Sequence, residues 1–210
     1  MHTASLLELA EFTVSRADQP LIEQLSLEVR GGEVWSLTGP NGCGKTTLLR
    51  TLAGLHSEAR GTFVSAPLAF LGHRPGLSLT LSPRANLAWY ARLCGVRDDA
   101  AARLGAVGLA GYADVPCAEL SAGQLRRVAL ARLTLQPVSL WLLDEPYTAL
   151  DSGGQALLDE LLLAHAARGG AALCATHQPL SQGGRFAAAG DAPVQIKSGM
   201  ALERWVAARA

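Results

Sequence analysis

The chain has 210 residues, which is enough for one sizeable domain or for one domain with a small inserted subdomain. Lysine plus arginine equals aspartate plus glutamate at 18 each, so the charge gives no indication of a nucleic-acid partner. We expect neither a signal peptide nor a membrane-spanning helix, because the N-terminus lacks a basic flank before an apolar run and no apolar stretch reaches roughly 18 residues.

The first third of the chain has the alternation and the turn residues of β-strands. Strands are expected at 6–14, 25–29 and 34–37, with turns at 16–20 and at Gly31-Gly32. Two further short strands are expected at 62–64 and 68–71. This part of the chain is therefore predicted to be rich in β-structure.

A glycine-rich loop follows the strand expected at 34–37 and precedes a helix expected at 46–53. It matches the phosphate-binding pattern G-x-x-x-x-G-K-[ST], in which the glycines let backbone N–H groups turn toward a phosphate and the helix N-terminus adds a positive dipole end. Lys45 supplies charge for the β- and γ-phosphates, and Thr46 suits one ligand position of Mg²⁺. The predicted nucleotide-binding residues of the loop are Gly39, Pro40, Asn41, Gly42, Cys43, Gly44, Lys45, Thr46 and Thr47.

The rest of the chain alternates helical patterns with buried strands. Helical patterns are expected at 83–113, as an inserted subdomain, and at 120–135 and 156–167. Continuous apolar runs at 140–143 and 171–175 are typical of buried parallel strands, and the remainder after 175 is weakly patterned. The alternation predicts an α/β fold with a mostly parallel sheet.

Two adjacent carboxylates, Asp144 and Glu145, end the strand expected at 140–143. Beside the phosphate loop, Asp144 is predicted to hold Mg²⁺ and Glu145 to polarise the water that attacks the γ-phosphate. His177 follows the next buried strand at the same sheet edge and is predicted to contact the γ-phosphate. The carboxylates of Asp144 and Glu145 together indicate that the nucleotide is hydrolysed and not only bound.

The segment LSAGQ at 120–124 opens the helix expected at 120–135, with Ser121 as its N-cap. Taken alone, the segment is an ordinary start of a capped amphipathic helix. Its place between the phosphate loop and the acidic strand indicates a second role, because a serine hydroxyl and the N–H groups of a helix end can bind a phosphate.

With these motifs in this order, the chain resembles the nucleotide-binding subunit of ATP-binding cassette (ABC) transporters. The resemblance rests on the phosphate loop, the LSAGQ signature, Asp144-Glu145-Pro146, Ala149-Leu150-Asp151 and His177. It implies a P-loop NTPase cassette with a mostly parallel core sheet, an N-terminal antiparallel β-subdomain and an inserted helical subdomain. It also implies a single domain over 1–210, with the RecA-like core and β-subdomain at about 1–80 and 137–210 and the helical subdomain at about 81–136.

The resemblance further implies a function. Two subunits pair head to tail, and each ATP with its Mg²⁺ lies between one phosphate loop and the other subunit's Ser121, Gly123 and Gln124. Glu145 then orients water, Lys45 and His177 stabilise charge on the γ-phosphate, and a separate membrane permease receives the motion. No nucleic acid takes part. The expected location is the cytoplasmic face of the bacterial inner membrane, peripherally, and the four cysteines without metal-ligand spacing favour a reducing compartment.

Two positions depart from the family pattern. The aromatic residue that usually stacks on adenine is replaced by Arg16, whose guanidinium can also stack on a base. The glutamine that usually contacts Mg²⁺ falls at His73, with Arg74 beside it. Which of these two takes the metal role, or whether neither does, stays open.

Within the family, the segments 71–76, 126–133 and 175–180 are similar to the ATP-binding subunit of the bacterial cytochrome c maturation system, a heme exporter ATPase. This implies a CcmB-like permease as partner. The motifs equally fit an ABC exporter or importer of an ion, peptide or lipid, because the permease selects the substrate. Two further alternatives are a soluble cassette ATPase, which usually has two cassettes or a long coiled coil, and a regulatory module without turnover, against which Glu145 and His177 argue.

Overall fold

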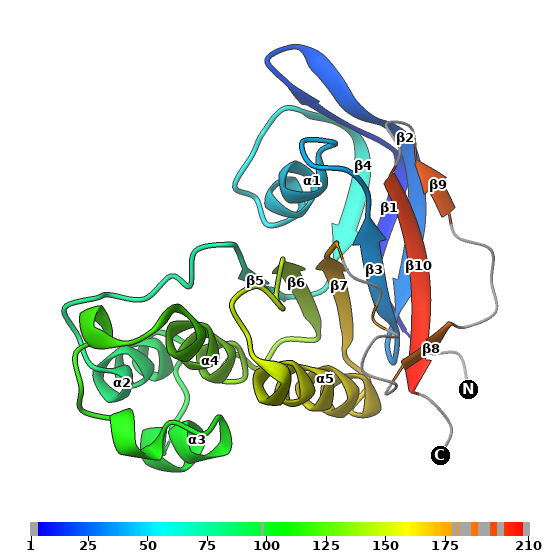
Figure 1. Cartoon of the computed structure of the whole chain (residues 1–210). Helices are drawn as coiled ribbons and strands as arrows, with labels where there is room; N and C mark the ends of the chain where they lie inside the picture. The colour runs from blue at the N-terminus through cyan, green and yellow to red at the C-terminus, as the bar shows by residue number, and fades with distance from the viewer. Residues whose placement is uncertain are drawn as a thin grey trace. The chain divides into compact units, whose positions relative to one another are not determined.

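The computed structural model describes residues 4–97, 99–177, 180, 186–188, 194–196 and 200–207 (Figure 1). The chain divides into two compact units, and the first holds the strands whereas the second is mainly helical. The first unit is Met1–Phe70, Val138–Pro146 and Asp159–Ala210, and the second is Leu71–Pro137 and Tyr147–Leu158.

The N-terminal strands form a three-stranded antiparallel sheet in the order β2-β1-β4. They are β1 (Ser5–Arg16), β2 (Gln19–Arg30) and β4 (Ala59–Ser65). Alternate apolar side chains of β1 and β2 are buried, as expected for a sheet with one face on a core. The antiparallel β-subdomain predicted from the sequence is therefore confirmed, with strands longer than the apolar runs alone indicated.

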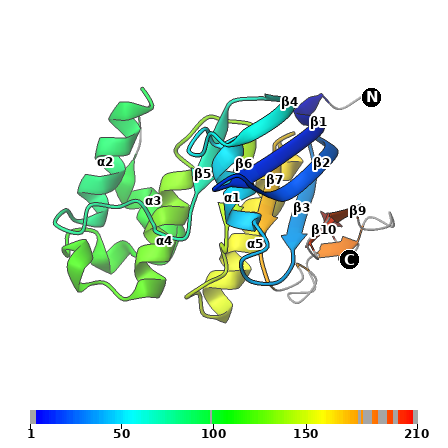
Figure 2. The ribbon, with the colours of Figure 1, turned by 90° about the horizontal axis from the view of Figure 1, so that it is seen from above.

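The core sheet has the order β5-β6-β7-β3-β10-β8, and β9 pairs with β10. Its strands are β3 (Val34–Thr38), β5 (Leu68–Leu71), β6 (Leu140–Asp144), β7 (Ala171–Ala175), β8 (Phe186–Ala188), β9 (Val194–Ile196) and β10 (Met200–Ala207). The parallel pairs β3–β7 and β6–β7 confirm the α/β class, and β6 and β7 are buried throughout. At one side β10 runs antiparallel to β3, and the two strands lie side by side in Figures 1 and 2.

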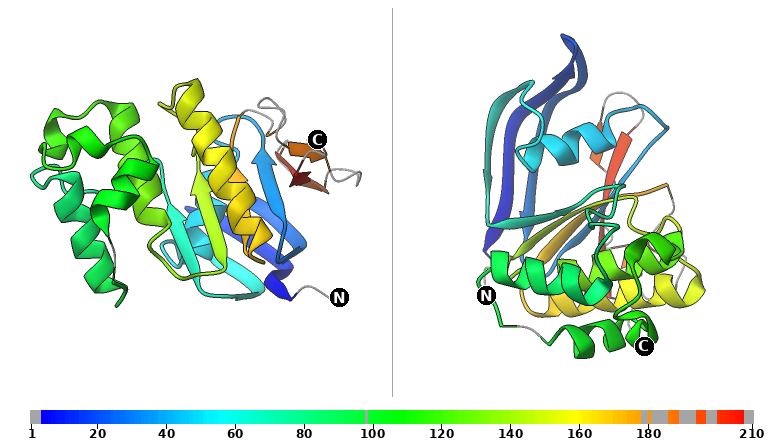
Figure 3. Two further views of the ribbon diagram at one scale, coloured as in Figure 1. Left: turned by 90° about the horizontal axis from the view of Figure 1, so that it is seen from below. Right: turned by 90° about the vertical axis from the view of Figure 1, so that its left-hand side faces the viewer.

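Helix α1 (Lys45–Leu52) contacts β1 of the antiparallel sheet and β6 and β7 of the core sheet, and Figure 3 (right) draws it between the two sheets. The leucines of α1 join a single apolar core with Leu140 and Leu142 of β6. Trp141 points to the other face of β6, where its ring stacks on His165 of helix α5 (Ser152–Ala167), with ring centroids 3.8 Å apart. Helices therefore cover both faces of the core sheet.

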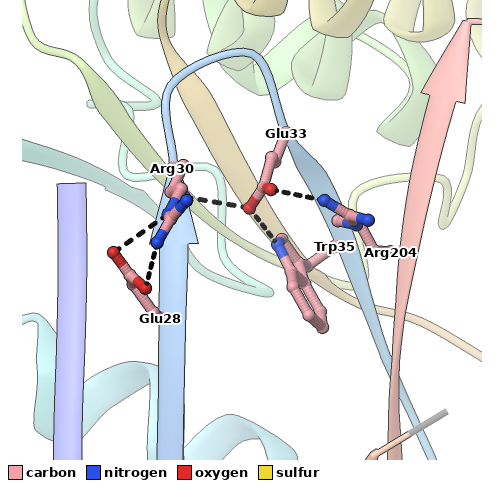
Figure 4. A network of polar contacts seen from close by, with 5 residues as sticks. All are labelled: Glu28, Arg30, Glu33, Trp35 and Arg204. Carbon is pink, nitrogen blue, oxygen red and sulfur yellow. Dashed lines mark hydrogen bonds and ion pairs between the residues drawn. The ribbon is translucent and has the colours of Figure 1, made fainter. Parts of the chain in front are cut away.

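A polar network anchors β10 to the start of β3 (Figure 4). Glu33, in the turn between β2 and β3, accepts hydrogen bonds at Oε2 from the backbone N–H of Arg30 and from Trp35 Nε1, both at 2.9 Å. Its Oε1 accepts a hydrogen bond from Arg204 Nη1 of β10, also at 2.9 Å. The weakly patterned end of the sequence gave no prediction of β10, because its stability rests on this long-range pairing.

The second unit is built from α2 (Pro83–Leu93), α3 (Ala100–Ala106) and α4 (Ala122–Leu133), with two short 3-10 turns at Ala110–Tyr112 and Cys117–Glu119. The helical pattern expected at 83–113 is therefore present but interrupted, since Gly95 follows α2 with a positive φ of 67°. The three helices share an apolar core that includes Leu87, Leu104 and Val128.

Candidate functional site

The phosphate loop joins β3 to α1. Gly44 occupies the N-cap of α1 with φ 111°, and because glycine has no side chain, the first N–H groups of the helix stay available to a ligand. Lys45 is buried, and its Nζ donates hydrogen bonds to the carbonyl oxygens of Gly39 (2.7 Å) and Pro40 (3.1 Å). The lysine thus folds back over the loop, where its charge is held ready for an anion.

Gly39 and Gly44 of the loop are favoured by close approach as well as by backbone angle, whereas Gly42 is favoured by its positive φ of 80° alone. A Cβ at Gly39, where φ is 150°, would lie 3.0 Å from Cys43 Sγ and 3.0 Å from Met200 Cγ. A Cβ at Gly44 would lie 3.2 Å from Leu21 Cβ. Met200, the first residue of β10, therefore packs directly against the loop. Nothing in the sequence indicated this contact, because Met200 lies about 160 residues downstream of the loop.

Thr46 and Asp144 meet at the end of β6. Thr46 Oγ1 donates a 2.9 Å hydrogen bond to Asp144 Oδ1, although the two residues lie 98 positions apart in the sequence. A hydroxyl and a carboxylate oxygen at this spacing are a donor set that suits a hard divalent cation such as Mg²⁺. The pair therefore fits the metal that the sequence predicted.

Glu145 and His177 form the second pair of the site. His177 Nε2 lies 3.0 Å from Glu145 Oε1. Glu145 has a positive φ of 48°, and its backbone N–H donates a 2.9 Å hydrogen bond to the carbonyl oxygen of Ala175 in β7. A left-handed conformation at a residue other than glycine is costly, and its presence here is consistent with a functional constraint on the direction of the carboxylate.

Lys45, Thr46, Glu145 and His177 line one cavity of about 570 Å³ in the first unit. Its lining consists of Arg16, Leu21, Asn41, Gly42, Gly44, Lys45, Thr46, Thr47, Arg50, His56, Glu145 and His177. Arg16 lines the same cavity as the loop, and its predicted contact with the base stays a prediction. Leu21, Arg50 and His56 were missed. Arg50 was in reach of sequence reasoning, because it lies three and four residues after Thr47 and Thr46 and so shares their helix face.

The signature segment lies in the second unit, where a capping box starts α4. Ser121 Oγ accepts a 3.2 Å hydrogen bond from the backbone N–H of Gln124, and Gln124 Oε1 accepts a 2.9 Å bond from the backbone N–H of Ser121. The prediction of Ser121 as the N-cap is confirmed. A Cβ at Gly123 would lie 2.8 Å from the carbonyl oxygen of Ala149, so this position needs glycine.

An ion pair closes the same region. Arg127 Nη2 lies 2.6 Å from Asp151 Oδ1, which also accepts a 2.8 Å hydrogen bond from the backbone N–H of Gly154 at the start of α5. The Gly154 hydrogen bond, followed by Arg127, lowers the pKa of Asp151. Together with the signature residues, Arg127 and Asp151 line a cavity of about 410 Å³ in the second unit.

The structure leaves the roles of His73 and Arg74 as predictions. Both side chains are exposed in the segment between β5 and α2 of the second unit. Gln178 and Pro179, which contribute to the resemblance in 175–180, lie outside the described residues. In the part of the chain that the structure describes, no helix combines the length and apolarity needed to cross a membrane.

Comparison with known proteins gives one consistent family. A family model described as "ABC transporter" matches residues 22–148. The chain is 45% identical over 190 residues to the "Cytochrome c biogenesis ATP-binding export protein CcmA" of Yersinia pestis bv. Antiqua, covering 83% of this chain and 87% of the relative. It is 43% identical over 188 residues to the protein of the same description from Alcanivorax borkumensis, covering 87% of each chain.

Solved structures give the same fold. A putative ABC transporter ATP-binding protein from Pyrococcus furiosus matches with a TM-score of 0.73 at 26% identity, covering 84% of this chain and 93% of that one. The ATP-binding subunit of another ABC transporter matches with a TM-score of 0.73 at 25% identity, covering 81% and 79%. The chain belongs to the ABC transporter family, as the ATP-hydrolysing subunit of a transporter.

Proposed function

We propose that this subunit hydrolyses ATP to power the export step of cytochrome c biogenesis, through a separate membrane permease. The process named for its relatives supports the assignment to cytochrome c biogenesis, and the paired residues of the loop cavity support the chemistry. The observation that carries the proposal is the contact of Glu145 with His177 in the same cavity as Lys45 and Thr46. A general base, a positioned imidazole and an anion-binding loop are the parts that phosphoryl transfer to water requires.

In this proposal the triphosphate binds at the loop from Gly39 to Thr47, with Lys45 on the β- and γ-phosphates. Thr46 and Asp144 would hold Mg²⁺, which supplies charge neutralisation for the phosphates when it is bound. Glu145 accepts a proton from the attacking water, and His177 keeps the carboxylate in place and contacts the γ-phosphate. His73 is proposed as a further metal contact, and Arg16 as part of the nucleotide site.

The active unit is proposed to be a head-to-tail pair of these chains at the cytoplasmic face of the inner membrane. Ser121, Gly123 and Gln124 of one copy would complete the site of the other. The helical subdomain at about 81–136, inserted between core segments at about 1–80 and 137–210, would pass the motion to a CcmB-like permease. An ABC transporter for an ion, peptide or lipid is the second candidate, since the same cavity would serve it equally well.

The test is to purify the chain with its permease from the membranes of its own host and to identify that permease by mass spectrometry. We expect a permease of cytochrome c biogenesis and ATP-dependent phosphate release. Deletion of the gene should also abolish c-type cytochromes, as read by heme staining, with rescue by the wild-type gene but not by Glu145→Gln. Phosphate release together with a different permease and normal cytochromes would retain the ATPase and overturn its assignment to cytochrome c biogenesis.

A further inference from the structure

The loop cavity includes a group of residues that phosphate chemistry does not use. Arg16 ends β1, His56 lies in the segment between α1 and β4, and Arg50 lies on the cavity face of α1. Arg50 is one helical turn past Thr46, which is about 6 Å along the helix axis. A nucleotide with its phosphates at the N-terminus of α1 therefore needs room for its sugar and base on this side of the cavity.

His56 is tied directly to the end of β1. Its Nε2 lies 2.7 Å from the carbonyl oxygen of Ser15, the residue before Arg16. Because a carbonyl oxygen can only accept a hydrogen bond, Nε2 carries the hydrogen, and the neutral ring is the Nε2–H tautomer. The backbone N–H of Ser15 in turn donates a 2.8 Å hydrogen bond to the carbonyl oxygen of Glu58. Two hydrogen bonds thus hold the His56 segment against β1 and keep the imidazole beside Arg16.

Planar groups of this kind bind nucleobases. Bases stack on the rings of histidine and other aromatic residues and on the guanidinium plane of arginine. The other imidazole of the cavity, His177, is held by Glu145 at the phosphate end. Among the described lining residues, His56 is therefore the aromatic ring that remains for the base.

We propose that His56 is a nucleobase-stacking residue of the ATP site, with Arg16 as a second flat surface. The inference rests on the proposed ATP site and deepens it, because it names a residue that distinguishes a nucleotide from a bare phosphate chain. The hydrogen bond to Ser15 fixes the ring in place before the ligand arrives, so less conformational entropy is lost on binding.

Two substitutions separate the ring from its tether. His56→Gln removes the aromatic ring but keeps an N–H group near the position of Nε2 that can donate to the Ser15 carbonyl, whereas His56→Phe keeps a ring and removes the donor. The full-length chain with Mg²⁺ is titrated calorimetrically with ATP and, separately, with inorganic triphosphate, which has the phosphates but no base. A thermal melt of each variant checks that it is folded.

The wild type should bind both ligands. His56→Gln should weaken ATP binding by about five- to a hundredfold, the range for loss of one base–aromatic stack, and leave triphosphate binding unchanged. His56→Phe should bind ATP within about threefold of the wild type, by the same stacking argument. Unchanged ATP binding by His56→Gln, equal weakening of the binding of both ligands, or loss of ATP binding by the phenylalanine variant would overturn the stacking role. Failure of the wild type to bind either ligand would overturn the proposed ATP site itself, so the two failures are distinct.

Discussion

The two helix N-termini that the sequence assigns to phosphate chemistry are built in opposite ways. Helix α1 begins after Gly44, which offers no side chain to its N–H groups. Helix α4 begins at Ser121, which forms a complete capping box with Gln124. One helix end is open to a ligand, and the other satisfies the N–H groups of Ser121 and Gln124 with its own side chains.

The difference indicates that the two ends would contact ATP through different groups. At α1 the backbone N–H groups and Lys45 are the donors for a phosphate. At α4 the backbone N–H of Gln124 already donates to Ser121 Oγ, but the serine hydroxyl keeps its own hydrogen as a donor. The cap therefore uses the Gln124 N–H group but not the Ser121 O–H group or the N–H groups of Ala122 and Gly123, so the serine hydroxyl is the side-chain donor that the signature would offer to a phosphate.

The largest effect on ATP hydrolysis is expected from a substitution in the first unit, because the proposed base, Glu145, lies there beside the open N-terminus of α1. Glu145→Gln removes the base but keeps the size of the side chain. We expect the rate of phosphate release to fall by about a hundredfold or more, the usual contribution of a general base, with ATP affinity within about threefold of the wild type. Turnover is measured by phosphate release and affinity by calorimetry. Wild-type turnover in this variant would remove Glu145 from the chemistry.

Substitutions at Ser121 test the claim that its hydroxyl acts as a donor. Ser121→Ala removes both the cap and the O–H group, Ser121→Gly removes the O–H group but sacrifices only a few tenths of a kcal/mol of capping, and Ser121→Thr keeps both. If the hydroxyl donates to a phosphate, the ATPase rate should fall by roughly ten- to a hundredfold in both the alanine and glycine variants, from the loss of a hydrogen bond to a charged group. The threonine variant should stay active.

The control for this series is stability. The alanine variant should lose about 1 kcal/mol of helix stability and the glycine variant much less, as measured by urea unfolding. A glycine variant with wild-type ATPase would show that Ser121 matters only as a cap. The two helix ends would then differ in function as well as in construction.

The phosphate loop, Asp144, Glu145 and His177 could be predicted because each lies in a short local pattern at the end of a strand or the start of a helix. The α/β class followed from the alternation of apolar runs for the same reason. The contact of Thr46 with Asp144 was then a consequence of topology, because strands that end at one sheet edge bring their end residues together.

Residues that act through tertiary contact could not be found in this way. His56 lies in a segment whose place is set by hydrogen bonds to β1, and Met200 begins a strand whose pairing partner is far upstream. The LSAGQ pattern predicted the cap at Ser121 but not the return hydrogen bond from the Ser121 N–H to Gln124, and serine at this position suits a cap and a ligand equally well. Whether such a side chain caps a helix or binds a ligand depends on which of its hydrogen-bonding groups are already used within the protein.

The open end of α1 depends on support from β10, and Met200→Ala tests that support. Met200 is fully buried beneath Gly39 and Gly44, so its truncation leaves a cavity under the loop and should destabilise the fold by about 2–5 kcal/mol. A displaced loop should also raise the KM for ATP by roughly tenfold or less, with a smaller change in kcat. Steady-state phosphate release provides both constants.

A matched control lies on the same strand. Leu202 is also fully buried and pairs with Leu37 of β3, so Leu202→Ala should destabilise the fold to a similar extent without touching the loop glycines. We expect its KM to stay at the wild-type value and Met200→Leu to restore most of the affinity. An equal rise in KM for both alanine variants would mean that general stability, and not support of the loop, sets the affinity.

The smallest effect is expected in the region of the capped helix α4, from the ion pair of Asp151 with Arg127. The N–H of Gly154 and then Arg127 lower the pKa of the Asp151 carboxyl below 3.8, its unperturbed value. The charged carboxylate is thus favoured in the folded state, so its contribution to stability is complete above pH 3.8 and is lost as the pH falls through the lower folded-state pKa. The Asp151→Asn variant should be slightly less stable than the wild type at pH 7. The stabilities of the two proteins should converge as the pH falls below the folded-state pKa of Asp151.

This expectation is tested by measuring the urea unfolding midpoints of the wild type and Asp151→Asn from pH 7 downward. The difference between the two midpoints at each pH removes the effect of the carboxylates that both proteins contain. Asp114→Asn is the control, because Asp114 is an exposed partner of Arg84 in the same unit and its pKa is lowered chiefly by that arginine. A difference between Asp151→Asn and the wild type that stays constant at every pH would exclude the charge as its cause. The signature end of α4 would then be held by hydrogen-bond geometry alone, which would sharpen the contrast with α1, where Lys45 holds a charge in readiness for the ligand.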